Sequence, residues 1–311
     1  MRALLVLLLA TALWGSATAS SKWAVGAAPF EVVAAIRFAA GAVIMLLVVR
    51  FTRTATPVAR VSSALAGLLG VFVYNALFFW GLSLAPAVDA SVIVPGLSPL
   101  ITAAVSAVTG GQGLSRRRVV ALCSALAGTA LFAVGAFEGP SAGTDRLLGD
   151  LVFLVCAAIW SGYTLLGQRA LAGTPPLHAT AYGLAAGAVP LLLLSAPAAT
   201  QVTWSALSAG FWFNMVFLTL GPTCLAGLLY YSSIRDVGAA TASVATFLVP
   251  VFGAVFATVF LGESVSAVQA VGAVVMLCGS AVAVLDGQAA RARKRAEQRE
   301  GGGHEPARQI G

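Results

Sequence analysis

Charged residues are scarce in this chain. Asp, Glu, Lys and Arg together make up only 9% of its 311 residues, whereas a soluble domain carries roughly 25%. Hydrophobic residues make up 59%. A chain with so few charges cannot cover its whole surface with groups that water solvates. The composition therefore excludes an ordinary soluble domain and predicts an integral membrane protein.

Residues that carry catalysis or bind metals are equally scarce. The only two histidines are His178 and His304, neither stands in an H-E-x-x-H zinc motif, and no Walker sequence for ATP is present. Four cysteines each fall inside an apolar run, where they suggest neither a disulfide framework nor a metal cluster: Cys123, Cys156, Cys224 and Cys278. An intramembrane enzyme is therefore disfavoured, and we expect no metal and no cofactor.

Long apolar runs are what the chain has in place of charges. Each is about 18 to 25 residues long, which is enough to cross roughly 30 Å of hydrocarbon as a helix. The links between them are too short to hold a soluble domain. The sequence thus predicts ten transmembrane helices, over residues 3–22, 30–50, 62–84, 88–109, 117–137, 148–171, 178–196, 206–232, 239–261 and 266–286.

Basic residues are distributed unevenly between the predicted loops. With the N-terminus inside, the other side of the membrane holds only Lys22 and Arg146 of the basic residues. This asymmetry predicts a multi-pass protein of the inner or plasma membrane with both termini in the cytoplasm. Much of the net charge of +7 lies in residues 288–311, a segment polar enough to be a disordered tail. The charge therefore indicates orientation in the lipid bilayer rather than a nucleic-acid partner.

An internal repeat divides the chain into two halves. At an offset of 146 residues, "LWGSATASSKWAVGAAP" aligns without a gap with "IWSGYTLLGQRALAGTP", which pairs Trp14 with Trp160. At an offset of 151 residues, Pro99 falls on Pro250. The sequence therefore predicts a tandem duplication of five helices, in residues 1–138 and 147–287.

Five is an odd number, so the two repeats would enter the membrane from opposite sides. That inverted arrangement is common in secondary transporters, which bind substrate near the membrane midplane between the repeats. The start of the chain also fits a signal peptide, with Arg2, an apolar run and the small residues "ATA". A cleaved leader would not share a pattern with a helix in the middle of the chain, so we favour a first transmembrane helix.

The segments "WGSATASSKWAVGAAPFEVVAAIRF", "LVPVFGAVFATVFLGESVS" and "QAVGAVVMLCGSAV" resemble the drug/metabolite transporter superfamily in its ten-helix form with two EamA domains. The resemblance covers nearly everything from residue 3 to residue 286. It implies an all-α membrane fold of two inverted five-helix repeats and a secondary transporter, more often an exporter than an importer. The first repeat departs from the pattern, because Gln112 replaces the glutamate that Glu263 retains in the second.

Polar and aromatic side chains gather on one face of two repeat-related helices. In the first helix they follow the α-helical period from Thr11 to Lys22. Lipid penalises such a face, so we expect it to point into the bundle or a water-filled cavity. Packing between helices is the alternative for the hydroxyl residues, interhelical bonding for Asn75, and the interfacial aromatic belt for Tyr230. The predicted cavity residues are Trp14, Thr18, Tyr74, Asn75, Ser91, Ser98, Trp160, Tyr163, Thr164, Asn214, Thr223, Tyr230 and Thr246.

Prolines interrupt two of the predicted helices. Pro95 and Pro99 lie in residues 88–109, and Pro250 lies in residues 239–261. Each removes a backbone hydrogen bond, and broken helices at membrane depth are tolerated only where they face protein or water. We therefore predict hinges or gates at these positions, although membrane helices carry more proline than soluble ones in any case.

Charges inside the predicted spans are few. The three candidates for a role in binding or coupling are Arg37, Glu31 and Glu263. Arg37 suits an anionic group of a substrate, and a structural pairing with Glu31 or with helix carbonyls is equally well supported. No carboxylate falls clearly at mid-depth, where a proton-coupled antiporter needs one. Proton coupling is therefore weakly supported, and facilitated export stays open.

Together these patterns predict a secondary transporter that exports small metabolites such as amino acids by alternating access through a central polar and aromatic cavity. One alternative is a multidrug or other metabolite permease of the same fold. Another is a membrane receptor or scaffold, which the two-sided access of an inverted repeat disfavours. We expect a small-molecule substrate as the partner and a chain compatible with a monomer.

Overall fold

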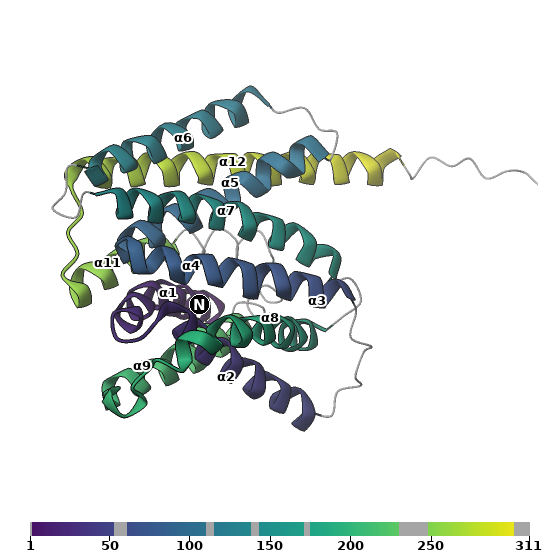
Figure 1. The fold of residues 1–311 in the computed structure, drawn as a ribbon. Helices are drawn as coiled ribbons and strands as arrows, with labels where there is room; N and C mark the ends of the chain where they lie inside the picture. Colours follow the sequence, from purple (N-terminus) through teal and green to yellow (C-terminus); the bar gives the residue numbers. More distant parts are fainter. Residues whose placement is uncertain are drawn as a thin grey trace, which may run out of the picture.

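The structure, a computed structural model, is built from α-helices that lie roughly side by side (Figure 1). It describes residues 2–52, 61–109, 115–137, 143–170, 175–229 and 248–301, and no strand occurs within these ranges. The predicted all-α class is confirmed for this part of the chain.

The helices of the first half follow the predicted spans closely. A stretch from residue 61 to residue 84 is one continuous helix with a π-helical turn in its middle. The elements are α1 (Arg2–Val25), α2 (Phe30–Phe51), α3 (Val61–Gly67), η1 (Leu68–Val73), α4 (Tyr74–Leu84), α5 (Ala87–Thr109) and α6 (Arg116–Phe137).

The second half repeats this order. Its third helix also runs through a π-helical turn, and it continues to residue 229. The elements are α7 (Thr144–Ala170), α8 (Pro176–Ala199), the short η2 (Trp204–Ala206), α9 (Ala209–Leu218), η3 (Thr219–Leu225), α11 (Leu248–Leu261) and α12 (Ala267–Gly301).

The two π-helical turns stand at matching places in the two halves. Adding 151, the offset that places Pro99 on Pro250, to Leu68 at the start of η1 gives Thr219 at the start of η3. A π-helical turn is rare and often marks a functional region, because its wider winding leaves backbone carbonyls without their usual partners.

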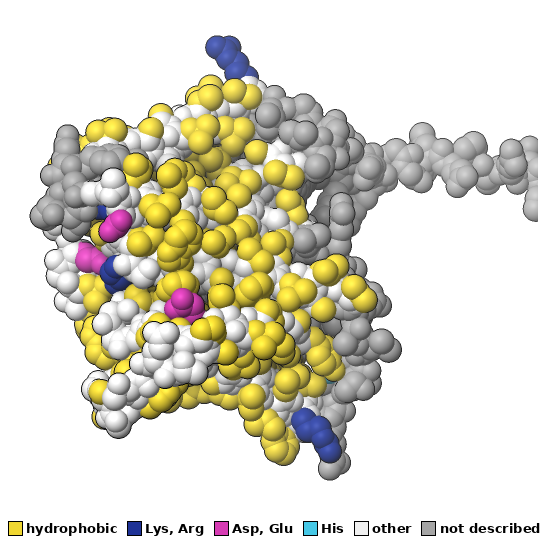
Figure 2. Space-filling view, in the orientation of Figure 1, with side chains coloured by type: hydrophobic (Ala, Val, Ile, Leu, Met, Phe, Trp, Pro, Cys, Tyr) yellow, Lys and Arg dark blue, Asp and Glu magenta, His cyan; other side chains and the backbone are white. Residues whose placement is uncertain are grey.

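Apolar side chains cover the outside of the bundle. Among the residues that the structure describes, five helical stretches are long and apolar enough to cross a membrane: Phe30–Phe51, Ala64–Leu84, Thr144–Tyr163, Leu177–Ala199 and Ala209–Leu229. Figure 2 shows a broad hydrophobic face, with the acidic side chains gathered toward the left of the view. An exposed apolar surface of this extent would be costly in water and suits lipid, so the fold is that of a membrane protein.

Helices from the two halves of the chain pack directly on each other. α6 lies along α12, α2 along α8, α1 along α11, and α5 along α7. Glycines allow the closest of these crossings: a Cβ on Gly128 of α6 would overlap the backbone of Met276 in α12, and one on Gly272 would overlap the backbone of Phe132. Small residues of this kind let membrane helices approach closely.

The last helix is longer than the sequence analysis allowed. α12 continues to Gly301, past the predicted end of the span at residue 286 and into the segment predicted as a disordered tail. The residues there, "AARARKRAEQRE", are strong helix formers. Their charge argues against a membrane span, but it does not argue against a helix, so α12 extends beyond the predicted span.

Candidate functional site

An aromatic cluster lies where α4 packs on α7. The ring of Tyr74 stacks on Phe78 with centroids 5.5 Å apart, and Trp160 lies 5.0 Å from Tyr74 and 5.4 Å from Tyr163. Phe153 extends the cluster, 5.9 Å from Phe78. Trp160 is 39% exposed, so the cluster is open on one side. Three predicted cavity residues from distant parts of the chain are thus brought together.

Arg37 is buried in α2, with only 8% of its surface exposed. Its Nε donates to Thr223 Oγ1 at 2.9 Å, and its Nη1 donates to Ser21 Oγ at 3.2 Å. The guanidinium carbon lies 5.0 Å from the ring centre of Phe38 and 5.9 Å from that of Phe79. Aromatic faces attract a cation at such distances. Arg37 is therefore held by hydroxyls and rings.

The Arg37 site continues into the aromatic cluster. Phe79, which faces the guanidinium, packs edge-on against Phe78 with centroids 6.1 Å apart, and Phe78 stacks on Tyr74. Glu31, a partner weighed from the sequence, is not among the contacts described for Arg37. The cation thus adjoins a wall of aromatic rings, and no carboxylate stands among its described partners.

The π-helical turn η3 is tied to α1 and α2 by side chains. Trp14 donates its indole N–H to the carbonyl of Pro222 at 3.2 Å, and Thr223 receives the bond from Arg37. Just before this turn, Asn214 of α9 donates to the carbonyl of Ser20 in α1 at 2.9 Å. These predicted cavity residues therefore hold the helices around Arg37 in place.

The other π-helical turn satisfies its carbonyls within its own helix. The side-chain amide of Asn75 donates to the carbonyls of Gly70 and Val71, at 3.2 and 2.8 Å. The sequence left cavity lining and interhelical bonding open for Asn75. The described bonds are neither, because the amide turns back to carbonyls of the π-helical turn in its own helix.

Three predicted hydroxyl residues lie in the packed interior. Thr18, Ser91 and Ser98 are all buried, and each donates to a carbonyl three or four residues earlier in its own helix. A Cβ on Gly253 of α11 would overlap Ser91 and approach Thr18 Oγ1 to 3.4 Å. These contacts match the packing alternative for Thr18 and Ser91.

The remaining predicted residues are placed less fully. Thr164 lies in α7 and Pro99 in α5, but their side chains are outside the described part, and Tyr230 and Thr246 lie outside the described residues altogether. α5 runs through Pro95 as a single helix from Ala87 to Thr109. Pro250 is buried as the third residue of α11.

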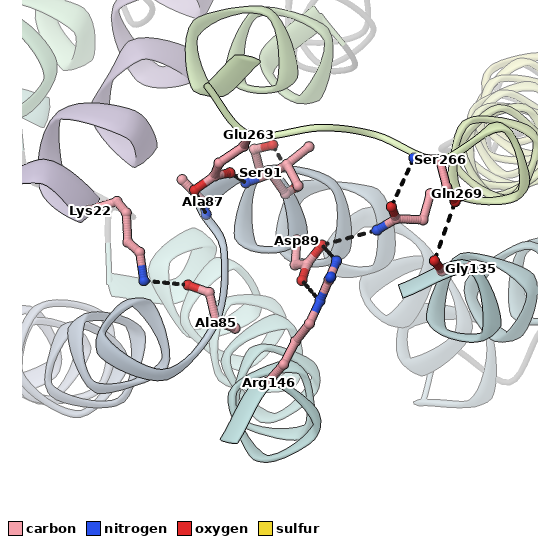
Figure 3. Close-up of polar contacts among 11 residues, drawn as sticks. Lys22, Ala85, Ala87, Asp89, Ser91, Gly135, Arg146, Glu263, Ser266 and Gln269 are labelled. Carbon is pink, nitrogen blue, oxygen red and sulfur yellow. Dashed lines mark hydrogen bonds and ion pairs between the residues drawn. The ribbon is translucent and has the colours of Figure 1, made fainter. Parts of the chain in front are cut away.

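A charged cluster occupies the place where the start of α5, the start of α7 and the connection from α11 to α12 meet (Figure 3). Arg146 forms a two-pronged ion pair with Asp89, through bonds of 2.8 Å to Oδ2 and 2.9 Å to Oδ1. Gln269 donates to Asp89 Oδ1 at 3.4 Å. Asp89 is fully buried and Arg146 is 7% exposed. The pair therefore joins α5 to α7 inside the protein.

Glu263 holds the same region together from the loop after α11. Its two carboxylate oxygens accept the backbone N–H groups of Ala87 and Val88, at 2.9 and 2.8 Å. These are orphan donors at the start of α5, where a negative charge also meets the positive end of the helix dipole. Gly262 makes this possible with a φ of 67°, which ends α11 and turns the next residue toward α5.

Lys22 completes this end of the bundle. Its ammonium donates to the carbonyls of Leu82 and Ala85, at 2.6 and 2.9 Å. Those carbonyls lie at the C-terminal end of α4, where a cation is favourable. Lys22 therefore ties α1 to the end of α4.

Four residues of this cluster were not among the predicted site residues: Asp89, Arg146, Asp150 and Gln269. A signal was available, since Arg146 and Asp150 are four residues apart and so share one face of α7, next to the apolar run "LVFLV".

A groove of about 690 Å³ lies elsewhere, between α6 and α12. It is lined by apolar residues with Arg116 and Arg117, and none of the predicted site residues lines it.

The chain matches a family of known proteins in both halves. A family model described as the EamA-like transporter family matches residues 1–134 and 147–285. A crystal structure of another protein superposes with a TM-score of 0.63, covering 92% of this chain and 96% of that one at 24% sequence identity. That likeness shows a shared fold.

Several similar proteins are named as transporters. The chain is 29% identical to the uncharacterized transporter YyaM of Bacillus subtilis, over 88% of this chain and 91% of that protein. It is 27% identical to the aromatic amino acid exporter YddG of Ancylobacter novellus, over 70% of this chain and 74% of that protein. It is 25% identical to a probable terminal-alkyne amino-acid exporter of Streptantibioticus cattleyicolor, over 70% of each chain.

Proposed function

This chain belongs to the EamA-like transporter family, and from that premise we propose that it exports amino acids with aromatic or other apolar side chains. The predicted resemblance to the drug/metabolite transporter superfamily is confirmed by the same match. Family and relatives point to transport rather than to an enzyme. Two of the relatives are named as amino-acid exporters, which supports the substrate class proposed for this chain.

The observation that carries the proposal is the placement of Arg37 beside the aromatic cluster. A buried cation without a counter-charge is costly, and an incoming carboxylate would relieve that cost with short, charge-assisted hydrogen bonds. The apolar side chain of the same amino acid would pack on Tyr74 and Trp160, the open part of the cluster. One end of the ligand is thus recognised by charge and the other by aromatic surface.

The proposed architecture is ten transmembrane helices in two inverted repeats with both termini in the cytoplasm. Reciprocal packing supports it: α1 packs on α11 as α7 packs on α5, and η1 packs on α7 as η3 packs on α1. The matching π-helical turns support it too. In this arrangement the Arg37 site lies between the repeats, and the charged cluster around Asp89 lies at the outer end.

Counterflow in proteoliposomes tests the proposal. Full-length protein is reconstituted into vesicles preloaded with unlabelled L-phenylalanine, and entry of labelled L-phenylalanine is followed in competition with L-leucine, L-glutamate and phenethylamine. We expect saturable entry that L-leucine inhibits more strongly than L-glutamate does. Absence of counterflow for every amino acid by folded protein contradicts the proposal, and inhibition by phenethylamine alone favours the multidrug permease alternative.

A pair of tryptophan variants assigns the site. W160A removes the exposed ring of the cluster, and W204A removes a similarly exposed ring that stacks on Trp212 instead. An aromatic contact contributes about 0.5 to 1.5 kcal/mol beyond its buried area, so W160A should raise the half-saturation concentration of L-phenylalanine roughly 2- to 12-fold. W204A should leave it unchanged. Equal effects in the two variants would remove the cluster from the proposed site.

A further inference from the structure

Asp150 is a second acidic residue in the charged cluster at the start of α7. It is 8% exposed, and its Oδ1 is buried without a hydrogen-bond partner in the described part of the protein. Its carboxyl group lies close enough to the Asp89 carboxyl for the two charges to interact. Neither carboxylate can donate unless it carries a proton, so a bond between the two requires one bound proton.

The surrounding charges do not offset two carboxylates. Arg146, one turn before Asp150 in α7, supplies one positive charge and directs it to Asp89. Gln269 of α12 is neutral, and α4, which also packs on α7, has no charged residue between Tyr74 and Leu84. Within this group the charge is therefore −1 with both carboxyls ionised and zero with one proton bound.

The two other charged residues nearby are engaged elsewhere. Lys22 of α1 donates to the carbonyls that end α4, and Glu263 accepts the amides that begin α5. Glu263 adds a further negative charge close to Asp89, and Asp145 in the first turn of α7 is exposed to solvent. An unbalanced charge inside a low-dielectric bundle is costly, whereas a bound proton removes it without moving any helix.

We propose that Asp89 and Asp150 form a proton-binding site, and that proton uptake and release there are coupled to substrate export. The coupling rests on the transport function proposed above. Uptake converts one carboxylate to a carboxylic acid with a proton taken from water, and release returns that proton to water, so no other reactant takes part. This places the proton site at one end of the bundle and not at mid-depth, where the sequence analysis looked for it.

Release of the proton has a structural consequence. With both carboxyls ionised, Arg146 has to serve two anions, and no hydrogen bond can form between Asp150 and Asp89 because neither carries a proton. Asp89 is also the anchor for Gln269 of α12. The protonation state of the pair therefore biases how tightly α5, α7 and α12 are held together at the end that we place outside.

Infrared difference spectroscopy tests proton binding without any substrate. Full-length protein in liposomes is stepped from acidic to alkaline buffer, and the carbonyl stretch of protonated carboxylic acids is followed. We expect the wild type to lose such a band, D150N to lack it, and the control D145N to keep it. A band of equal size in D150N overturns the proposal.

D150N should fold, because an amide has the shape of the protonated acid, has no charge and can donate to Asp89. Unfolding of this variant therefore also overturns the proposal, since a neutral side chain at residue 150 is what the site requires.

A gradient experiment tests coupling separately. Uptake of labelled L-phenylalanine is measured with and without an imposed pH gradient, and with a sodium gradient at constant pH. We expect the ratio of uptake with and without the pH gradient to exceed one in the wild type and in D145N, and to fall to about one in D150N. A response to sodium alone overturns the proposal, as does a wild type that ignores the pH gradient. Absence of L-phenylalanine counterflow under every condition contradicts the proposed substrate, while the infrared result still decides the proton site.

Discussion

Two arginines are buried in this protein to almost the same extent, but their surroundings differ in kind. Arg146, 7% exposed, is neutralised by a two-pronged ion pair with Asp89. Arg37, 8% exposed, is held by two hydroxyls and two aromatic rings. Burial alone therefore does not tell a structural charge from a binding charge. The partners of the guanidinium make that distinction.

The two sites also differ in what remains available to a ligand. Arg146 directs Nε and Nη2 to a single carboxylate, and Gln269 adds a third bond to that anion. The described bonds of Arg37 use only two of the five N–H donors that a guanidinium carries. Its neighbouring rings, Phe38 and Phe79, are buried, and Phe79 leads through Phe78 and Tyr74 to the exposed Trp160. The first site is closed around its own charges, whereas the second keeps donors for the substrate carboxylate that we propose.

The largest expected effect is a difference in stability between variants that lack one or the other of the two arginines. Arg146→Met leaves two buried carboxyl groups without their cation, and removing one partner of a buried pair costs about 3 to 5 kcal/mol. Arg37→Met leaves no carboxylate behind among its described contacts, so the cost there should be much smaller. Thermal unfolding of both variants in detergent measures the difference. Equal loss of stability in the two variants would show that Arg37 is structural as well.

The next largest effect is on the recognition of the substrate carboxylate, which we assign to Arg37 and not to Arg146. Charge-assisted hydrogen bonds contribute about 1.5 to 3 kcal/mol, so Arg37→Met should weaken competition by L-phenylalanine in counterflow roughly 10- to 150-fold. The same variant should no longer distinguish L-phenylalanine from its amide, which lacks the carboxylate. Inhibition curves for both compounds provide the measurement. A variant that still prefers the free acid would place the carboxylate elsewhere.

The smallest expected effect is on the stability of a variant at Glu263, whose carboxylate binds backbone N–H groups and not an arginine. Glu263→Gln keeps one acceptor but removes the charge from the start of α5, where capping contributes about 1 kcal/mol. Glu31→Gln is the matched control, since Glu31 stands in the first turn of α2 without a described side-chain hydrogen bond. Denaturation midpoints should fall for Glu263→Gln and change less for Glu31→Gln. The opposite order would contradict the capping role.

Several features of the site could be predicted from the sequence. The helical period put Trp14 on a polar face of the first helix, and the internal repeat pointed to Trp160 as its counterpart. The π-helical turns could not be predicted, because nothing in "LLGVFV" and "TLGPTCL" marks a local widening of the helix. Asn75 was predicted to line a cavity or to bond between helices, but its described partners are carbonyls of the π-helical turn η1 in its own helix.

Long-range pairing was beyond the reach of sequence reasoning. Asp89 and Arg146 are separated by 57 positions, and only the packing of α5 on α7 brings them together. Glu263 was predicted to matter as part of the LGE pattern, yet its role as a cap for α5 depends on a contact 176 positions away. For Arg37 the sequence left an anionic ligand, Glu31 and helix carbonyls open. The structure placed Thr223, Ser21 and two rings around it.

By itself the sequence determined that this is a helical membrane protein with a repeated core, because the number of charges, the length of apolar runs and the helical period are properties of local stretches of chain. It also determined that polar faces had to turn inward, since lipid offers no hydrogen bonds. Only the tertiary structure decided which cation would be neutralised and which would stay available. That outcome depends on which helices pack together, and electrostatic energy depends on distances that the linear order of residues does not contain.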